Sequence, residues 1–137
     1  MPFDPDFKPS EHGLSTYQFL EPDKWYCQVV DYNLGHSQLL ISMTQVYTHE
    51  TLSLVCLDTR YFEGPLLWHG AAFHVAPMEE CEAILRKMNS KMNEAILKTE
   101  LEFQKLFTVD DVQALMTIKI MAGAAFVTDR KIGEFMS

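Results

Sequence analysis

Apolar and polar residues alternate with a period of two along the first half of the chain. Four such stretches lie between Lys24 and Val75, and short polar or glycine-containing segments separate them. Because successive side chains of a strand point to opposite faces of a sheet, this pattern predicts four strands joined as an antiparallel meander. The predicted strands span residues 25–33, 37–46, 51–59 and 66–75.

From Pro77 to Phe107 the apolar residues recur three or four positions apart, which predicts a long helix. An uninterrupted helix of this length would extend about 45 Å, whereas a nine-residue strand spans only about 30 Å. Either the helix breaks near Asn89, Ser90 or Asn93, or its free end packs on a second subunit. We favour the second arrangement and expect a homodimer.

A second apolar pattern runs from Val112 to Ala125 and predicts a shorter helix. Thr108 and Asp111 resemble a capping box at its start. The segment 117–121 is also compatible with a strand, which is the competing interpretation. The sequence therefore predicts an α+β fold, in which a four-stranded antiparallel meander is followed by a long helix and a second shorter helix packed on one face.

The length of 137 residues fits one domain. We divide the chain into an extended acidic N-terminal arm at residues 1–23, a sheet at 24–76, helices at 77–126 and a C-terminal tail at 127–137. No apolar run is long enough to span a bilayer, and the first ten residues lack the basic and apolar pattern of a signal peptide. We therefore expect a cytoplasmic protein.

The alternation in the strands gives the predicted sheet two largely apolar faces. One face forms the expected core and carries Cys27, Val29, Leu39, Ile41, Met43, Leu52, Leu54, Cys56, Ala71, Phe73 and Val75. The opposite face bears almost no charge, although a solvent-exposed sheet face normally does. We expect a partner, a second subunit or the arm to cover it. The predicted binding residues on this face are Tyr26, Tyr32, Val46, Val55 and Trp68.

The net charge of −8 limits the classes of partner. Nucleic acid and anionic membranes are disfavoured, because both are bound mainly through lysine and arginine. A basic protein is favoured, because the negative field of the chain would attract it. With an aromatic, uncharged sheet face, this charge indicates a non-catalytic protein-binding module of adaptor, chaperone or immunity type.

Residues that could hold a cofactor or a metal are sparse. The chain contains no GxGxxG, GxxxxGK[ST], GxSxG or HExxH motif, so no cofactor is expected. His69 and His74 are five residues apart on one predicted strand and so lie on opposite faces, which disfavours a metal site. The three cysteines form no CxxC motif and are expected to be buried free thiols.

One constellation supports an alternative function. If Cys56 pairs with Ala71, then Asp58 lies across from His69 at about 5 Å between Cβ atoms. An imidazole oriented by a carboxylate can act as a general base, although an ordinary ion pair explains the same arrangement. No nucleophile accompanies this pair, because Cys56 would face the core and Ser53 the other face of the sheet.

Three further residues extend this alternative into a pocket. Arg60, Tyr61 and His74 lie near Asp58 and His69 if the sheet curls over the helices. Such a pocket would serve a small-molecule-binding protein or an enzyme. The sequence thus predicts a protein-binding module first and a small-molecule site as its alternative.

Overall fold

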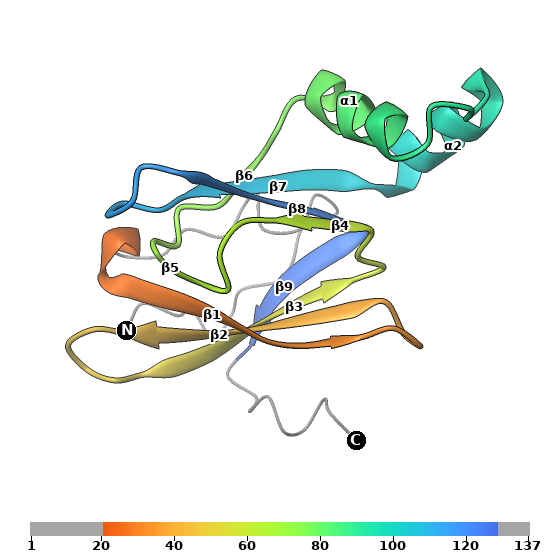
Figure 1. Ribbon diagram of the computed structural model, residues 1–137. Coiled ribbons are helices and arrows are strands. Elements are labelled where there is room, and N and C mark those ends of the chain that lie inside the picture. Colours follow the sequence, from red (N-terminus) through yellow and green to blue (C-terminus); the bar gives the residue numbers. More distant parts are fainter. Residues whose placement is uncertain (1–20, 129–137) are drawn as a thin grey trace.

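The computed structural model describes residues 21–128, which form two antiparallel sheets packed face to face with a helical hairpin at one end (Figure 1). This arrangement confirms the predicted α+β class. The strands run in the order β5-β1-β2-β3-β9 in the first sheet and β4-β8-β7-β6 in the second. The arm as far as residue 20 and the tail from residue 129 lie outside the described residues.

The described part of the chain contains nine strands and two helices. The strands of the first sheet are β1 (Trp25–Asn33), β2 (Gln38–Gln45), β3 (Thr51–Leu57), β5 (Leu67–His69) and β9 (Ala124–Thr128). The strands of the second sheet are β4 (Tyr61–Glu63), β6 (His74–Val75), β7 (Lys105–Asp110) and β8 (Thr117–Ala122). The helices are α1 (Met78–Met88) and α2 (Glu94–Phe103), and a short 3₁₀ turn at Pro22–Lys24 precedes β1.

The core lies between the two sheets. Nine of the eleven residues predicted to face the core are buried in it, and the other two, Val29 and Val75, pack against it while partly buried. The core prediction is therefore confirmed. Trp25, Trp68 and Phe107 are among its largest fully buried side chains. Strands β1, β2 and β3 form the expected meander, with ends within two residues of those predicted.

The fourth predicted strand, residues 66–75, is wrong as a single element. Its first part, β5, pairs with β1 in the first sheet, and its last part, β6, pairs with β7 in the second. Gly70 lies at the crossing with a φ of 139°, and a Cβ atom there would lie 2.7 Å from the carbonyl oxygen of Asp110. Only glycine adopts this conformation without strain, so the crossing requires it.

The second predicted helix, over Val112–Ala125, is also wrong. Residues 105–128 form β7, β8 and β9 instead, and the competing strand interpretation of 117–121 is correct. Ile118, Ile120 and Ala122 of β8 are buried in the core, which is the two-residue period of a strand with one apolar face. The turn segment at 61–63 likewise becomes β4 and pairs with β8.

The predicted long helix is broken into α1 and α2 in the region of Asn89 and Asn93. The Asn93 side chain accepts a hydrogen bond from the Ile96 backbone N–H at 2.8 Å and so caps the second helix. Both helices pack on the outer face of the second sheet through Cys81, Ile84, Leu85, Leu97, Leu106 and Met121. Because the helix is broken, the argument for a homodimer from one uninterrupted helix no longer applies. Neither helix has the length and apolar character needed to cross a bilayer.

Candidate functional site

Only some of the residues predicted to lie on the partner-binding face of the sheet are found there. Tyr26 and Val55 lie on the outer face of the first sheet, where Val55 is buried and Tyr26 is half-buried with its ring stacked on His69 at 4.2 Å. Val46 follows β2 and is also half-buried. Trp68 is instead paired with the core residue Cys27 and is 2% exposed. The face therefore lacks its largest predicted anchor.

Tyr32 also leaves the predicted face, because a β-bulge changes the alternation of β1. The register between β1 and β2 shifts between Val29 and Asp31, so Tyr32 pairs with the core residue Leu39. A bulge adds one residue to a strand and reverses the faces that follow it. Tyr32 therefore points to the inner side, where its hydroxyl donates to the carbonyl oxygen of Thr59 at 3.2 Å.

Asp58 and His69, the predicted dyad, are not brought together. Asp58 follows β3, which pairs with β2 and β9, whereas His69 belongs to the edge strand β5, which β1 and β2 separate from β3. The His69 imidazole Nε2 contacts the Asp23 carbonyl oxygen. The Asp58 carboxylate accepts hydrogen bonds from Arg60 Nε at 3.3 Å and from Gln104 Nε2 at 2.9 Å. The general-base interpretation of this pair is therefore wrong.

The cysteines are free and buried, as expected from the sequence. Burial raises the pKa of Cys56 to about 12 and raises the pKa of Cys27 as well. Burial also raises the pKa of Cys81, against a weaker opposite effect of Lys105. Among residues 21–128, no cluster of three or more His, Cys, Asp or Glu side chains has the geometry of a metal site.

The thiol pKa values predict slow alkylation of the native protein. The raised pKa of Cys56 leaves it with much less thiolate near neutral pH than an exposed cysteine has, and the thiolate is the reacting species. We expect iodoacetamide to leave Cys27 and Cys56 unmodified in the native protein and to modify both in urea, as measured by peptide mass spectrometry. Modification of either native thiol at the rate seen in urea would contradict this burial.

Arg60 and Tyr61, two of the residues in the alternative prediction, do line a pocket. It lies between the end of β1 and β4, has a volume of about 340 Å³ and also contains Tyr32. His74 lines a different hollow, next to Asp23 and Asp110. The structure thus supports a pocket near Arg60 but leaves both predicted histidines out of it.

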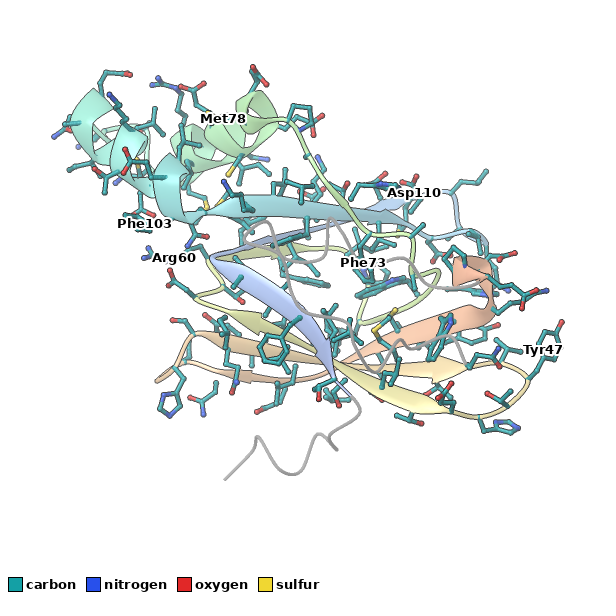
Figure 2. All side chains as sticks on the ribbon, turned by 180° about the vertical axis from the view of Figure 1, so that it is seen from behind. Tyr47, Arg60, Phe73, Met78, Phe103 and Asp110 are labelled. Atoms are coloured by element: carbon teal, nitrogen blue, oxygen red, sulfur yellow. The ribbon has the colours of Figure 1, made fainter. Side chains whose placement is uncertain are left out.

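The turn between β7 and β8 presents an apolar surface that the sequence does not reveal. Val112, Leu115 and Met116 are all exposed there, and we call these three residues the apolar tip. Leu115 is 91% exposed. The turn projects at the end of the second sheet away from the helical hairpin (Figure 1), the end at which Asp110 and Tyr47 are labelled in Figure 2. A projecting group of large apolar side chains is unusual for a solvated turn.

Hydrogen bonds fix the conformation of this turn. The buried Asp111 carboxylate accepts from the backbone N–H groups of Gln113 at 2.9 Å and Ala114 at 3.2 Å. The Asp111 N–H donates to the Met116 carbonyl oxygen at 2.8 Å, and the Val112 N–H donates to that of His69 at 2.9 Å. The apolar tip is therefore an ordered feature that is attached to β5.

Leu115 adopts a left-handed backbone conformation, with a φ of 54°. This region is uncommon for residues other than glycine, asparagine and aspartate, and it costs a leucine about 1 kcal/mol or more. Strain of this kind concentrates at functional sites. The turn thus exposes the Leu115 side chain to solvent, and the backbone conformation of Leu115 lowers the free energy of unfolding.

Two acidic hollows flank the apolar tip. The larger, of about 660 Å³, contains Met116 together with Glu63, Glu80, Asp110 and Lys119. The smaller, of about 200 Å³, contains Val112 together with Asp23 and Asp110. Four exposed carboxylates therefore line the two hollows that contain Met116 and Val112, together with Lys119 and His74. Such a surface complements an apolar patch with a basic rim.

The Asp111 carboxylate provides a test of the structure of this turn. We expect Asp111→Ala to lower the free energy of unfolding by about 1 to 2 kcal/mol, because two backbone N–H groups lose their acceptor. Asp111→Asn keeps one side-chain oxygen and should lose less. Urea denaturation measures both variants, and equal stability of Asp111→Ala and the unmodified chain would contradict the role of this side chain.

Sequence reasoning missed the apolar tip because its residues also fit a helix. Thr108 and Asp111 resemble a capping box, and Val112 and Leu115 fit the spacing of a buried helical stripe. An aspartate whose carboxylate accepts hydrogen bonds from the backbone N–H groups two and three residues later stabilises a turn. Its sequence pattern is the same as that of a helix cap. The adjacent pair Asp110 and Asp111 is the local signal that favours a turn.

No protein-family model matches the chain, and no match is found among curated proteins or solved structures. The geometry of the described surfaces therefore carries the functional interpretation.

Proposed function

We propose that the chain is a non-catalytic protein-binding module that docks through its apolar tip onto an apolar pocket of a basic partner. The observation that carries this proposal is Leu115, which is 91% exposed and held in a left-handed conformation by a turn that Asp111 fixes. This class of function is the one predicted from the sequence. The proposed binding surface, however, is the β7–β8 turn and not the outer face of the first sheet.

The apolar tip is suited to binding for an energetic reason. Complete burial of a leucine side chain contributes about 1.5 to 3 kcal/mol. Binding normally costs part of this energy, because loops and side chains lose freedom in the complex. The hydrogen bonds of Asp111 already fix the backbone around Leu115, so less of this cost falls on the binding step.

The surrounding charges favour one kind of partner. The carboxylates of Glu63, Glu80 and Asp110 lie in the hollows beside the apolar tip, and the whole chain carries a net charge of −8. Opposite charge around an apolar contact accelerates association and excludes acidic partners. Association should therefore slow as the salt concentration rises.

A non-catalytic role fits the chemistry of the described residues. The thiols are buried with raised pKa values, which removes them as nucleophiles. His69 and Asp58 lie on different elements and do not form a base with its orienting carboxylate. These observations support binding rather than reaction at the surfaces described.

Site-specific photocrosslinking tests the proposal. A diazirine analogue of leucine is placed at position 115, or at position 34 as the matched control, in cells that produce the chain. Leu34 is 82% exposed and lies in the turn between β1 and β2. We expect position 115 to form a crosslink to a distinct basic protein in at least about tenfold higher yield than position 34.

Three results would overturn the proposal. Equal yields at positions 115 and 34 would show that Leu115 has no preferred contact. A crosslink from position 115 to a second copy of the chain would identify a homodimer interface instead. A crosslink to lipid would identify a membrane contact.

A further inference from the structure

A second surface, distinct from the apolar tip, lies at the opposite end of the molecule. Figure 2 labels Arg60 at the end away from Tyr47 and Asp110. The pocket found there, which we call the aromatic pocket, has a volume of about 340 Å³, within the range of small-molecule sites. Its lining residues are Val29, Tyr32, Leu39, Thr59, Arg60, Tyr61, Phe62 and Leu66.

The interior of the aromatic pocket is apolar. Leu39 is part of the buried core, and Val29 and Phe62 pack against that core. The Phe62 ring lies 6.3 Å from the ring of the buried Trp68, centroid to centroid, so this wall of the pocket is backed by a second aromatic ring. An apolar body, and especially a flat aromatic one, matches these walls.

The charge at the rim disfavours an ionic ligand. Arg60 Nε donates to the Asp58 carboxylate at 3.3 Å, and Arg60 Nη1 lies 3.9 Å from the Glu100 carboxylate. An anion would meet these two carboxylates, and a cation would meet the guanidinium. The guanidinium has five N–H donors, and within residues 21–128 one of them donates to Asp58, so donors remain there for an uncharged oxygen.

Tyr32 and Tyr61 form aromatic walls of the pocket, but their hydroxyl groups already donate hydrogen bonds to other residues. The Tyr32 hydroxyl donates to the Thr59 carbonyl oxygen, and the Tyr61 hydroxyl donates to Glu63. The hydrogen bond to Glu63 raises the pKa of Tyr61, which keeps this hydroxyl neutral. Both side chains therefore act mainly as aromatic walls.

We propose that the aromatic pocket binds a small uncharged molecule that has an apolar, aromatic body and one carbonyl or hydroxyl oxygen. The body lies against Val29, Phe62 and Leu66, and the oxygen accepts a hydrogen bond from Arg60. No part of this site belongs to the apolar tip, so the two proposals stand or fall separately.

Three molecules that share a 2-phenylethyl group but differ in charge test the class of ligand. They are 4-phenylbutan-2-one, 3-phenylpropanoate and 3-phenylpropylammonium. Two-dimensional amide NMR titration measures the affinity and locates the bound molecule. We expect the ketone to bind at least about tenfold more tightly than either ion, with the largest shifts at residues 29, 32, 60 and 66. Tighter binding of an ion, no saturable binding, or shifts centred elsewhere would overturn the proposal.

Two adjacent leucines supply a matched pair of variants. Leu66 lines the pocket and is 66% exposed, whereas Leu67 is 57% exposed and pairs with Gln28 on the outer face of the first sheet. Because both side chains are largely in solvent, both variants should fold. We expect Leu66→Asp to weaken ketone binding by about tenfold and Leu67→Asp to change it by less than about twofold. Equal effects of the two variants would contradict the assignment of the pocket.

Discussion

Replacing Trp68 with alanine is expected to lower the free energy of unfolding by about 4 kcal/mol. The indole is 2% exposed within the core between the two sheets. Its Nε1 donates to the Gly70 carbonyl oxygen at 3.0 Å, and its ring packs beside Phe62. The variant removes this hydrogen bond and leaves a large cavity, since the surrounding strands can close over it only in part. Urea denaturation at equilibrium measures the loss.

The neighbouring residue provides the control. Leu67 lies on the outer face of β5 and is 57% exposed, so Leu67→Ala should cost less than about 1 kcal/mol. If Trp68 lay on the exposed outer side of β5, where Leu67 lies, its replacement would cost equally little. Similar losses in the two variants would therefore contradict the two-sheet core.

Strands β2 and β3 were predictable because their alternation is unbroken where they face the core. Leu39, Ile41 and Met43 of β2, and Leu52 and Leu54 of β3, occur at every second position and are all buried. Burial of one face imposes this period on any strand, whatever sheet it joins. The sequence therefore predicted most of the core, but not that a second sheet covers it.

The residues of the predicted binding face were misplaced by two local irregularities. The bulge between Val29 and Asp31 turns Tyr32 to the inner side, and Gly70 moves the chain from one sheet to the other after Trp68. A bulge leaves no reliable mark in a short strand, because an extra valine such as Val30 still fits the apolar pattern. Gly70 was visible in the sequence, but its meaning depends on the approach of Asp110, which lies far along the chain.

The second half of the chain shows the limit of periodicity. The helical pattern over Pro77–Phe107 was correct for α1 and α2, and the predicted break near Asn89 to Asn93 is present. The pattern over 112–125 fits a helix and a strand about equally well. Pairing of β8 with β7 and of β9 with β3 decides between them, and these partners are set by tertiary structure.

Replacing Leu115 with asparagine is expected to weaken binding of the protein partner by at least about 30-fold. This change corresponds to about 2 kcal/mol, which is the energy of burying one leucine side chain. Asparagine has a similar size but a polar amide, which an apolar pocket would leave without a hydrogen bond. The affinity is measured by calorimetric titration with the purified protein that crosslinks to position 115.

The same variant should leave the folded state intact. Asparagine tolerates the left-handed conformation that Leu115 adopts, so the variant relieves strain instead of adding it. We expect the free energy of unfolding to stay equal to that of the unmodified chain or to rise by up to about 1 kcal/mol. A loss of binding without a loss of stability would separate docking from folding.

The most direct test compares two leucines that are both almost fully exposed. Leu115 and Leu34 are 91% and 82% exposed and lie in different turns. In titrations with the crosslinked partner, we predict that Leu115→Asn weakens the affinity by at least about 30-fold and that Leu34→Asn changes it by less than about twofold. Unchanged affinity of Leu115→Asn would contradict the assignment of the apolar tip as the docking surface.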